Sequence, residues 1–288
     1  MKNNLTSHPS PLPSPPSSWD LGAYLISLAE KYETEDFILG DPSWFMHQVS
    51  GVENQETMAF IASALSYGSR KQFMPKIQTI MESAQGDVWQ WVMDGHFSSL
   101  PYHPSPLPSY LFSPDDHSCF YRLYTNATMY HFLSTLQQLF QRHHSLGSYL
   151  RQVMGHASQL DAYSALKAIS SWFADHQMVN GQCSSPIPKD TTSCCKRLCM
   201  FLRWMVRSGS PVDLGLWYDF IDRRTLIIPM DTHVVQQAMR LGLIDSKTTS
   251  MSNARKLTER LAGFFPDDPL RGDFALFGYG VNSVTNGQ

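Results

Sequence analysis

The stretch LIIPMDTHVVQQAMRLGL, Leu226 to Leu243, contains an apolar run, a proline, a single aspartate and then a helical pattern of apolar residues. Apolar side chains recur at helical spacing after Asp231, so we predict that this residue is the N-cap of a helix. A capping carboxylate accepts backbone N–H bonds at the positive end of the helix dipole, which stabilises the helix by about 1 kcal/mol. The same two effects keep the carboxylate ionised, as an enzyme needs where positive charge develops. Whether Asp231 is only a cap therefore depends on the residues that face it.

The same helical spacing recurs through the rest of the chain, and alternating strand-like segments are scarce. We predict helices over residues 21–32, 56–67, 72–83, 127–142, 162–175, 195–208, 232–241 and 253–264. A chain of this kind belongs to the all-α class. We expect two helical lobes, approximately residues 60–185 and 186–265, with a cleft between them and with the N- and C-terminal helices packing together.

Two segments are too rich in proline to form regular structure. Residues 1–19, which include SHPSPLPSPPSSW, should form an extended, disordered tail. Residues 98–116 contain five prolines and should form a long loop. We therefore assign the folded region to residues 20–288.

The composition is that of a globular protein: of 288 residues, 42% are hydrophobic and 16% are charged, with a formal net charge of -3. A uniformly basic surface for nucleic acid is therefore excluded, although a local basic patch is not. No apolar segment approaches the roughly 18 residues that a membrane span needs, and no signal peptide is recognisable, so we expect a cytoplasmic protein. The five cysteines form no paired CxxC motif and no metal-binding motif is present, so we expect reduced thiols and neither metal nor cofactor.

The segment CKRLCMFLRWMVRSG, residues 195–209, predicts an amphipathic helix with a basic face. Its buried stripe consists of Leu198, Phe201, Leu202 and Met205. Lys196, Arg203 and Arg207 lie on another face, and residues 189–212 contain five basic residues against one acidic residue. A polar face of this kind is most often simply solvated, and a functional basic patch is the alternative.

Three segments together resemble the helix-hairpin-helix DNA glycosylase superfamily. IPMDTHVVQQAMRLGL, residues 228–243, is similar to the part of these enzymes in which an aspartate opens a helix after an apolar run. ETMAFIASALSYGSRKQFMPKIQTIM, residues 56–81, resembles their early helix, turn and helix, whose turn probes DNA. The block from KRLCMFLRWMVR to DFALFGYG, residues 196–280, resembles a bacterial group of unassigned function associated with archaeal-type 8-oxoguanine DNA glycosylases. The resemblance covers roughly residues 32–282 and implies a two-lobed glycosylase-like fold.

The resemblance places the catalytic lysine at Lys196 and the catalytic aspartate at Asp231, 35 positions later. Lys189 competes for the lysine role, but its proline-flanked loop holds a side chain less firmly. In such enzymes an ionised carboxylate stabilises the positive charge that develops on deoxyribose as the N-glycosidic bond breaks. A lysine amine attacks C1′ to give a Schiff base, which also permits β-elimination. The alternative is that Lys196 and Asp231 form only a surface ion pair, worth under about 1 kcal/mol.

The same resemblance assigns residues to base recognition and to DNA binding. The predicted base-binding residues are Asp273, Phe277 and Trp44, and the predicted DNA-binding residues are Tyr67, Ser69, Arg70, Ser193, Arg197, Arg203 and His233. Asp273 and Phe277 share one helix face, where an acidic acceptor suits purine N–H donors and an aromatic ring can stack on a base for about 1 to 3 kcal/mol. The DFALF pattern is equally that of an ordinary capped core helix.

The sequence departs from the superfamily in two places. The Gln or Asn that usually fills the gap left by a flipped base is missing from the early turn, where Tyr67 and Arg70 are the candidates to replace it. The glycine-rich hairpin that normally precedes the lysine and grips a phosphate is replaced by SSPIPKDTTSCC, residues 184–195. Ser193 and the first amides of the following helix could still bind phosphate, because a helix N-terminus attracts anions.

Three functions follow from these residues. The first is a DNA glycosylase with abasic-site lyase activity, acting as a monomer on double-stranded DNA that carries an oxidised purine, with 8-oxoguanine as the foremost substrate, in the nucleoid-associated cytoplasm. The second is a protein of the same fold that binds lesions or DNA structures without catalysis. The third is a helical enzyme acting on a small nucleoside, or a protein-interaction scaffold. Steep salt dependence of binding to a damaged duplex would argue against the third.

Overall fold

The computed structural model describes residues 21–98, 111–155, 160–176 and 185–276. The helices are α1 (Leu21–Tyr32), α2 (Val52–Leu65), α3 (Arg70–Ser83), α4 (Val88–Met93), α5 (Asn126–His143), α6 (Leu146–Met154), α7 (Ala162–His176), α8 (Lys196–Val206), α9 (Thr232–Arg240) and α10 (Met251–Ala262). Short 3-10 helices are η1 (Glu35–Ile38), η2 (Pro42–His47) and η3 (Arg223–Thr225), and residues 271–276 are also helical. Strands β1 (Cys119–Tyr121) and β2 (Tyr124–Thr125) form an antiparallel hairpin. The prediction of an all-α protein is confirmed, with this hairpin as a local exception.

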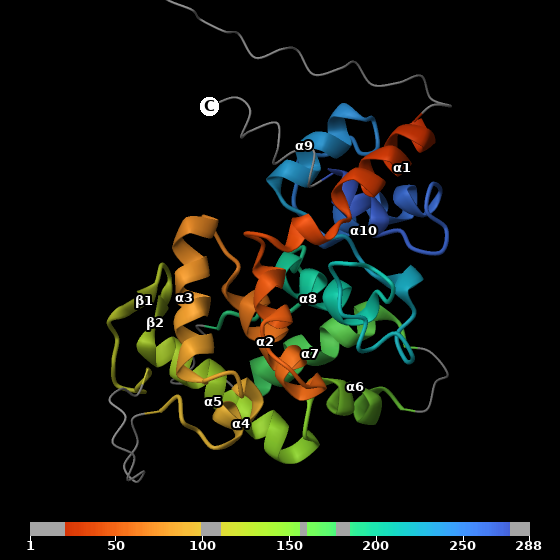
Figure 1. Ribbon diagram of the computed structural model, residues 1–288. Coiled ribbons are helices and arrows are strands. Elements are labelled where there is room, and N and C mark those ends of the chain that lie inside the picture. Colours follow the sequence, from red (N-terminus) through yellow and green to blue (C-terminus); the bar gives the residue numbers. More distant parts are fainter. Residues whose placement is uncertain (1–20, 99–110, 156–159, 177–184, 277–288) are drawn as a thin grey trace, which may run out of the picture.

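Helix α2 is the centre of the fold. Its residues from Glu56 to Leu65 are all buried, as expected of a helix that is covered on every side. It packs against η2, α3, α4 and α8 (Figure 1). The ring of Phe60 lies 5.9, 5.4 and 5.1 Å from those of Phe132, Phe173 and Phe201. A single aromatic side chain of α2 therefore joins α5, α7 and α8 in one core.

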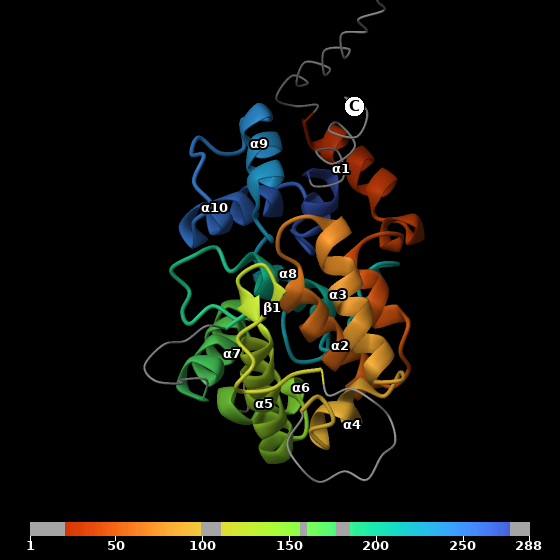
Figure 2. The ribbon, with the colours of Figure 1, turned by 90° about the vertical axis from the view of Figure 1, so that its left-hand side faces the viewer.

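Helices α1, α9 and α10 gather at one end of the molecule, and α4, α5 and α6 lie at the other (Figures 1 and 2). Helix α8 lies between these groups, so its first turn is close to both α9 and α2. The chain reaches α9 through an extended segment, residues 226–231, in which Leu226 to Met230 are buried. This segment carries Asp231 to the start of α9.

The eight predicted helices all exist, with ends that shift by up to four residues. Helices α4 and α6 and the hairpin were not predicted. The predicted tail, residues 1–19, and most of the predicted loop, residues 98–116, lie outside the described residues. In the described part of the chain, no helix combines the length and apolar character that crossing a bilayer requires.

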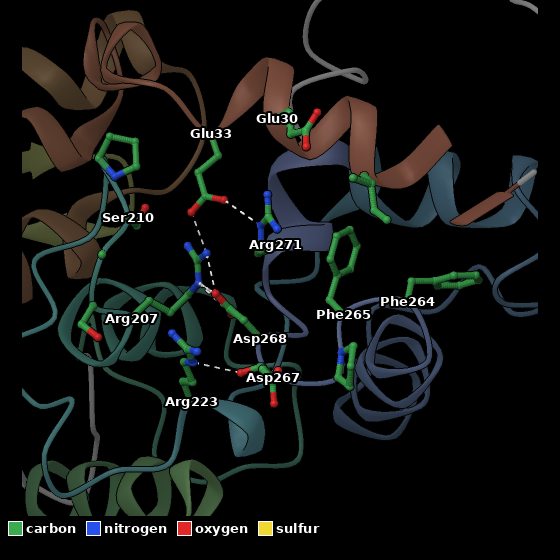
Figure 3. Close-up of a pocket in the computed structure, with 15 residues that line it drawn as sticks. Glu30, Glu33, Arg207, Ser210, Arg223, Phe264, Phe265, Asp267, Asp268 and Arg271 are labelled. Atoms are coloured by element: carbon green, nitrogen blue, oxygen red, sulfur yellow. Dashed lines mark hydrogen bonds and ion pairs between the residues drawn. The ribbon is translucent and has the colours of Figure 1, made fainter. Parts of the chain in front are cut away.

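An ion-pair cluster ties the end of α8 to both ends of the described chain. Arg207 is only 2% exposed, and its guanidinium lies 2.6 Å from Glu33 and 2.8 Å from Asp268 (Figure 3). It also pairs with buried Asp213, while Arg271 approaches the other oxygen of Glu33 at 3.4 Å. We call these five residues the Arg207 cluster; a hollow of about 650 Å³ lies beside it. The expectation of a solvated face is wrong for Arg207, because the three carboxylates of Glu33, Asp213 and Asp268 enclose it.

Candidate functional site

A pocket of about 770 Å³ lies where the first turns of α8 and α9 meet the turn between α2 and α3. This volume is typical of pockets that hold small molecules, about 300 to 1,000 Å³. Nine of the predicted site residues line it: Tyr67, Arg70, Ser193, Lys196, Arg197, Arg203, Asp231, His233 and Asp273. The structure therefore brings together side chains that lie as much as 206 positions apart in the sequence.

Lys196 and Asp231 meet at the wall of this pocket. The Nζ atom of Lys196 lies 2.9 Å from Oδ2 of Asp231, and the two side chains are 34% and 17% exposed. Lys196 is the first residue of α8, and Asp231 is the residue before α9. The two helix N-termini thus bring an amine and a carboxylate to one point from which both reach the pocket.

The two oxygens of Asp231 have separate roles. Oδ1 accepts the backbone N–H groups of His233 and Val234, both at 2.9 Å, as the predicted N-cap requires. Oδ2 accepts from Lys196. Burial alone would raise the pKa of Asp231, but the charge of Lys196 and the hydrogen bonds lower it below its ordinary value. The cap holds the carboxylate in place and leaves its other oxygen for the pocket.

The loop before α8 makes its turn without glycine. Cys195 has φ 47° and ψ 38°, the left-handed conformation, and its side chain is buried. A residue other than glycine pays about 1–2 kcal/mol in this conformation. Ser193 lies on the pocket wall and forms an isolated β-bridge with Ser250, the N-cap of α10. The bridge fixes the loop that leads into Lys196 and α8.

Tyr67 and Arg197 lie side by side at the rim. The Tyr67 side chain is exposed, at 44%, and the guanidinium of Arg197 lies 5.8 Å from its ring. Arg197 also donates to the backbone oxygen of Ala64 at 2.6 Å, which fixes α8 against the end of α2. Arg70 pairs with Asp41 at 3.0 Å. The turn between α2 and α3, which we predicted to probe DNA, therefore lies at the rim of the same pocket as Lys196.

Asp273 and Arg203 form a buried pair at this pocket. Nη1 of Arg203 lies 2.5 Å from Asp273, and its Nε lies 3.2 Å from Asp213. Burial raises the pKa of Asp273 to about 6, although Arg203 acts to lower it. Arg203 is only 5% exposed, so it does not lie on an open basic face as its predicted contact with DNA requires. Asp213 and Asp273 hold Arg203 inside the protein, where their charges offset that of the guanidinium.

The remaining predicted residues lie elsewhere. Trp44 is half-buried against Phe45 and is not part of the pocket, and Ser69 is exposed outside it. Phe277 lies outside the described residues. Lys189, the competing lysine, is exposed and does not line the pocket. The geometry therefore favours Lys196 over Lys189 as the amine of the site.

The sequence did not reveal several residues of the pocket wall. Phe37, Phe73 and Met200 supply apolar surface, and Cys194 lies close to the central pair. The Cys194 Sγ atom lies 3.4 Å from the backbone oxygen of Met230, and burial raises the pKa of this thiol. Phe37 belongs to a short 3-10 helix without a periodic pattern, so nothing in its local sequence marks it. Within the described residues, no group of three or more His, Cys, Asp or Glu side chains could hold a metal ion.

Comparison with known families gives one match. Residues 41–282 match a family described as "Protein of unknown function (DUF2400)". The chain belongs to the DUF2400 family. No curated protein and no solved structure matched the chain. The family region contains the whole pocket except Phe37, so the candidate site is a feature of the DUF2400 domain in this chain.

Proposed function

We propose that this DUF2400 protein is a DNA glycosylase with abasic-site lyase activity that removes an oxidised purine, with 8-oxoguanine as the foremost substrate. The observation that carries the proposal is the 2.9 Å contact between Lys196 and Asp231 at the wall of a pocket of about 770 Å³. The chemistry needs an amine and an ionised carboxylate beside a space that admits a flipped base. These three features occur together here.

Each group has a step in the reaction. As the N-glycosidic bond breaks, its electron pair leaves with the base, and Asp231 stabilises the positive charge on the sugar. Asp231 also lies at hydrogen-bond distance to take the proton of Lys196, and the freed lone pair of Nζ then forms the bond to C1′. Asp231 passes the proton that it has taken to the departed base. Nζ then loses a second proton to Asp231, its lone pair breaks the C1′–O4′ bond, and O4′ takes up that proton, which leaves the protonated Schiff base between Nζ and C1′. Loss of a proton from C2′ then expels the 3′ phosphate and cleaves the strand.

The pocket wall supplies groups that suit a base. Phe37, Phe73 and Tyr67 offer aromatic surface, and Asp273 offers an acceptor for purine N–H groups. Flipping costs a few kcal/mol, which such contacts offset. We propose that the pocket is the cleft between two helical lobes, approximately residues 60–185 and 186–265, and that a monomer binds damaged duplex DNA there in the nucleoid-associated cytoplasm.

A lesion-binding protein without catalysis is the second candidate. Its support is the ion pair itself, because an ammonium group bound to Asp231 has no lone pair with which to attack until a proton leaves. The changed loop before α8 also suits a protein that binds DNA but has lost the glycine-rich grip. Both candidates use the same surface and differ only in turnover.

A panel of duplexes, each with one damaged base, tests the proposal. We expect release of an oxidised purine and strand cleavage by the wild-type protein, and neither product from Lys196→Gln. Binding to the damaged duplex without release of any base would instead support the lesion-binding protein. No binding to any duplex would reject both candidates.

A further inference from the structure

The hairpin of β1 and β2 presents an apolar side chain to solvent at its tip. Tyr121 pairs with Tyr124, which leaves Arg122 and Leu123 as the two tip residues. Arg122 has φ 51°, so the chain turns sharply there. Leu123 is 73% exposed, the largest value among the exposed large hydrophobic residues of the described chain. An apolar side chain this exposed has no role in the core.

Three contacts fasten this hairpin to the rim of the pocket. The hydroxyl of Tyr121 donates to the backbone oxygen of Tyr67. The guanidinium of Arg122 lies 5.0 Å from the ring of Tyr67, the residue that precedes Gly68. The hydroxyl of Tyr124 accepts from Arg197 at 2.7 Å, and Arg197 adjoins Lys196 in α8. The hairpin tip, the turn after α2 and the reactive lysine thus form one connected structure.

Gly68 makes the closest of these approaches feasible. Its φ is +88°, and a Cβ atom added there would lie 2.0 Å from Nη1 of Arg122. The bare backbone at this position lets the arginine lie flat across the turn. Figure 2 shows the hairpin beside α3, on the side where the turn between α2 and α3 stands.

The charge around the tip suits a polyanion. Arg122 and Arg197 flank Tyr67, and Lys76 of α3 lies 4.9 Å from the ring of Phe120 in β1. The carboxylate of Asp116 lies at the base of the hairpin, where it accepts from Ser118 and Asn126. Positive charge at the tip with an exposed leucine is a combination that binds phosphates and enters a base step.

We infer that the hairpin is a second duplex-probing element, in which Leu123 enters the base stack next to Tyr67 while Arg122 pairs with the phosphate backbone. This inference rests on the proposed function, because it takes DNA as the partner. Wedges of this kind partly unstack a base step and kink the duplex. Leu123 is therefore needed for paired DNA and dispensable for a single strand, whose bases are already free.

Binding of Leu123→Ala to DNA tests the inference. The probes are a duplex and a single strand that each contain a stable abasic-site analogue, and the readout is fluorescence anisotropy. We expect Leu123→Ala to bind the duplex about ten-fold more weakly than the wild type and the single strand within about two-fold. Val153→Ala, which shortens another exposed apolar side chain (50%) on α6, is the matched control and should leave both affinities unchanged.

The outcomes separate the inference from the proposed function. Equal duplex affinity for Leu123→Ala and the wild type would overturn the wedge, as would an equal loss on duplex and single strand. The anisotropy assay measures binding alone and does not depend on catalysis. A wedge effect in this assay, together with no base release from the panel of damaged duplexes, would reject the glycosylase and retain the hairpin as a DNA-probing element. A wild-type protein that binds neither probe would reject both.

Discussion

At the scale of single residues, the contacts of Asp231 explain why a carboxylate lies between an apolar run and a helix. One oxygen caps α9 through two backbone N–H groups, and the other contacts Lys196. A cap by itself would use any of several polar residues. Because Oδ1 caps the helix and Oδ2 does not, Asp231 can stabilise α9 and still present an ionised oxygen to the pocket.

We predict that Asp231→Asn separates stability from activity. Asparagine caps helices about as well as aspartate, so unfolding in urea should shift by less than about 1 kcal/mol. Loss of the charge that faces the sugar should slow base release by about 100-fold or more, measured in single turnover on a lesion duplex. Asp222→Asn is the control, because Asp222 also caps a helix, η3, and has a similar exposed fraction of 18%. Full activity of Asp231→Asn would show that this carboxylate is only a cap.

Single residues differed in how well the sequence predicted them. The N-cap at Asp231 and the buried stripe of α8 follow from local pattern, and both are observed. The pairing of Lys196 with Asp231 came from resemblance, since no local rule joins residues so far apart. Arg203 was misjudged, because its partners Asp213 and Asp273 lie outside its helix and only the fold brings them to it.

At the scale of elements, α6 is capped by another helix. The carboxylate of Glu56 in α2 accepts the N–H groups of Leu146 and Gly147 at 2.7 and 3.1 Å, and that of the Trp217 indole at 3.0 Å. Burial raises the pKa of Glu56 to about 7, despite these hydrogen bonds. A Cβ atom on Gly147 would lie 3.1 Å from this carboxylate, so glycine leaves room for the contact. The cap joins segments 90 positions apart.

We predict a pH-dependent stability from this cap. Folded Glu56 holds its proton up to about pH 7, whereas the ordinary pKa is 4.5, so the folded state binds more protons between these values. Stability should therefore fall as pH rises through this window, by about 3 kcal/mol from this group. Urea unfolding of Glu56→Gln at pH 5 and pH 7.5 should lack that part of the fall. Glu82→Gln, which removes an exposed carboxylate on α3, should retain it. An unchanged slope in Glu56→Gln would contradict the prediction.

Sequence pattern predicted the long helices and missed the short elements. Helix α4 has six residues and α6 has nine, too few for the apolar repeat to stand out, although Asp87 and Ser145 are ordinary N-caps. The hairpin has strands of three and two residues, and its contacts with Tyr67 and Arg197 determine its position. Such elements depend on tertiary contacts that a local pattern does not contain.

At the scale of the whole molecule, the Arg207 cluster joins α8 to the segments that begin and end the described chain. Glu33 follows α1, and Asp268 and Arg271 follow α10 (Figure 3). The sequence contained no sign of it, because its members lie up to 238 positions apart. Since α8 also carries Lys196, the cluster fixes the far end of the helix whose first residue lies in the pocket.

We predict that Arg207→Met destabilises the protein by about 3 to 5 kcal/mol, because removal of one partner leaves buried carboxylates uncompensated. Equilibrium unfolding in urea measures this loss. Arg224→Met is the control: Arg224 pairs with Asp222 at 2.7 Å but is 59% exposed, and an exposed pair contributes about 0 to 1 kcal/mol. Similar losses in the two variants would show that the cluster adds no more than a surface pair.

Trapping with borohydride tests the central proposal most directly, because it reduces a Schiff base between the protein and an abasic sugar to a stable bond. The wild-type protein, incubated with a duplex containing 8-oxoguanine, should give a covalent adduct, and peptide mapping should place the DNA on Lys196. Lys189→Gln should give the same adduct, and Lys196→Gln should give none. Absence of an adduct from the wild type on the 8-oxoguanine duplex and on an abasic duplex, or an adduct that persists in Lys196→Gln, would contradict the assignment.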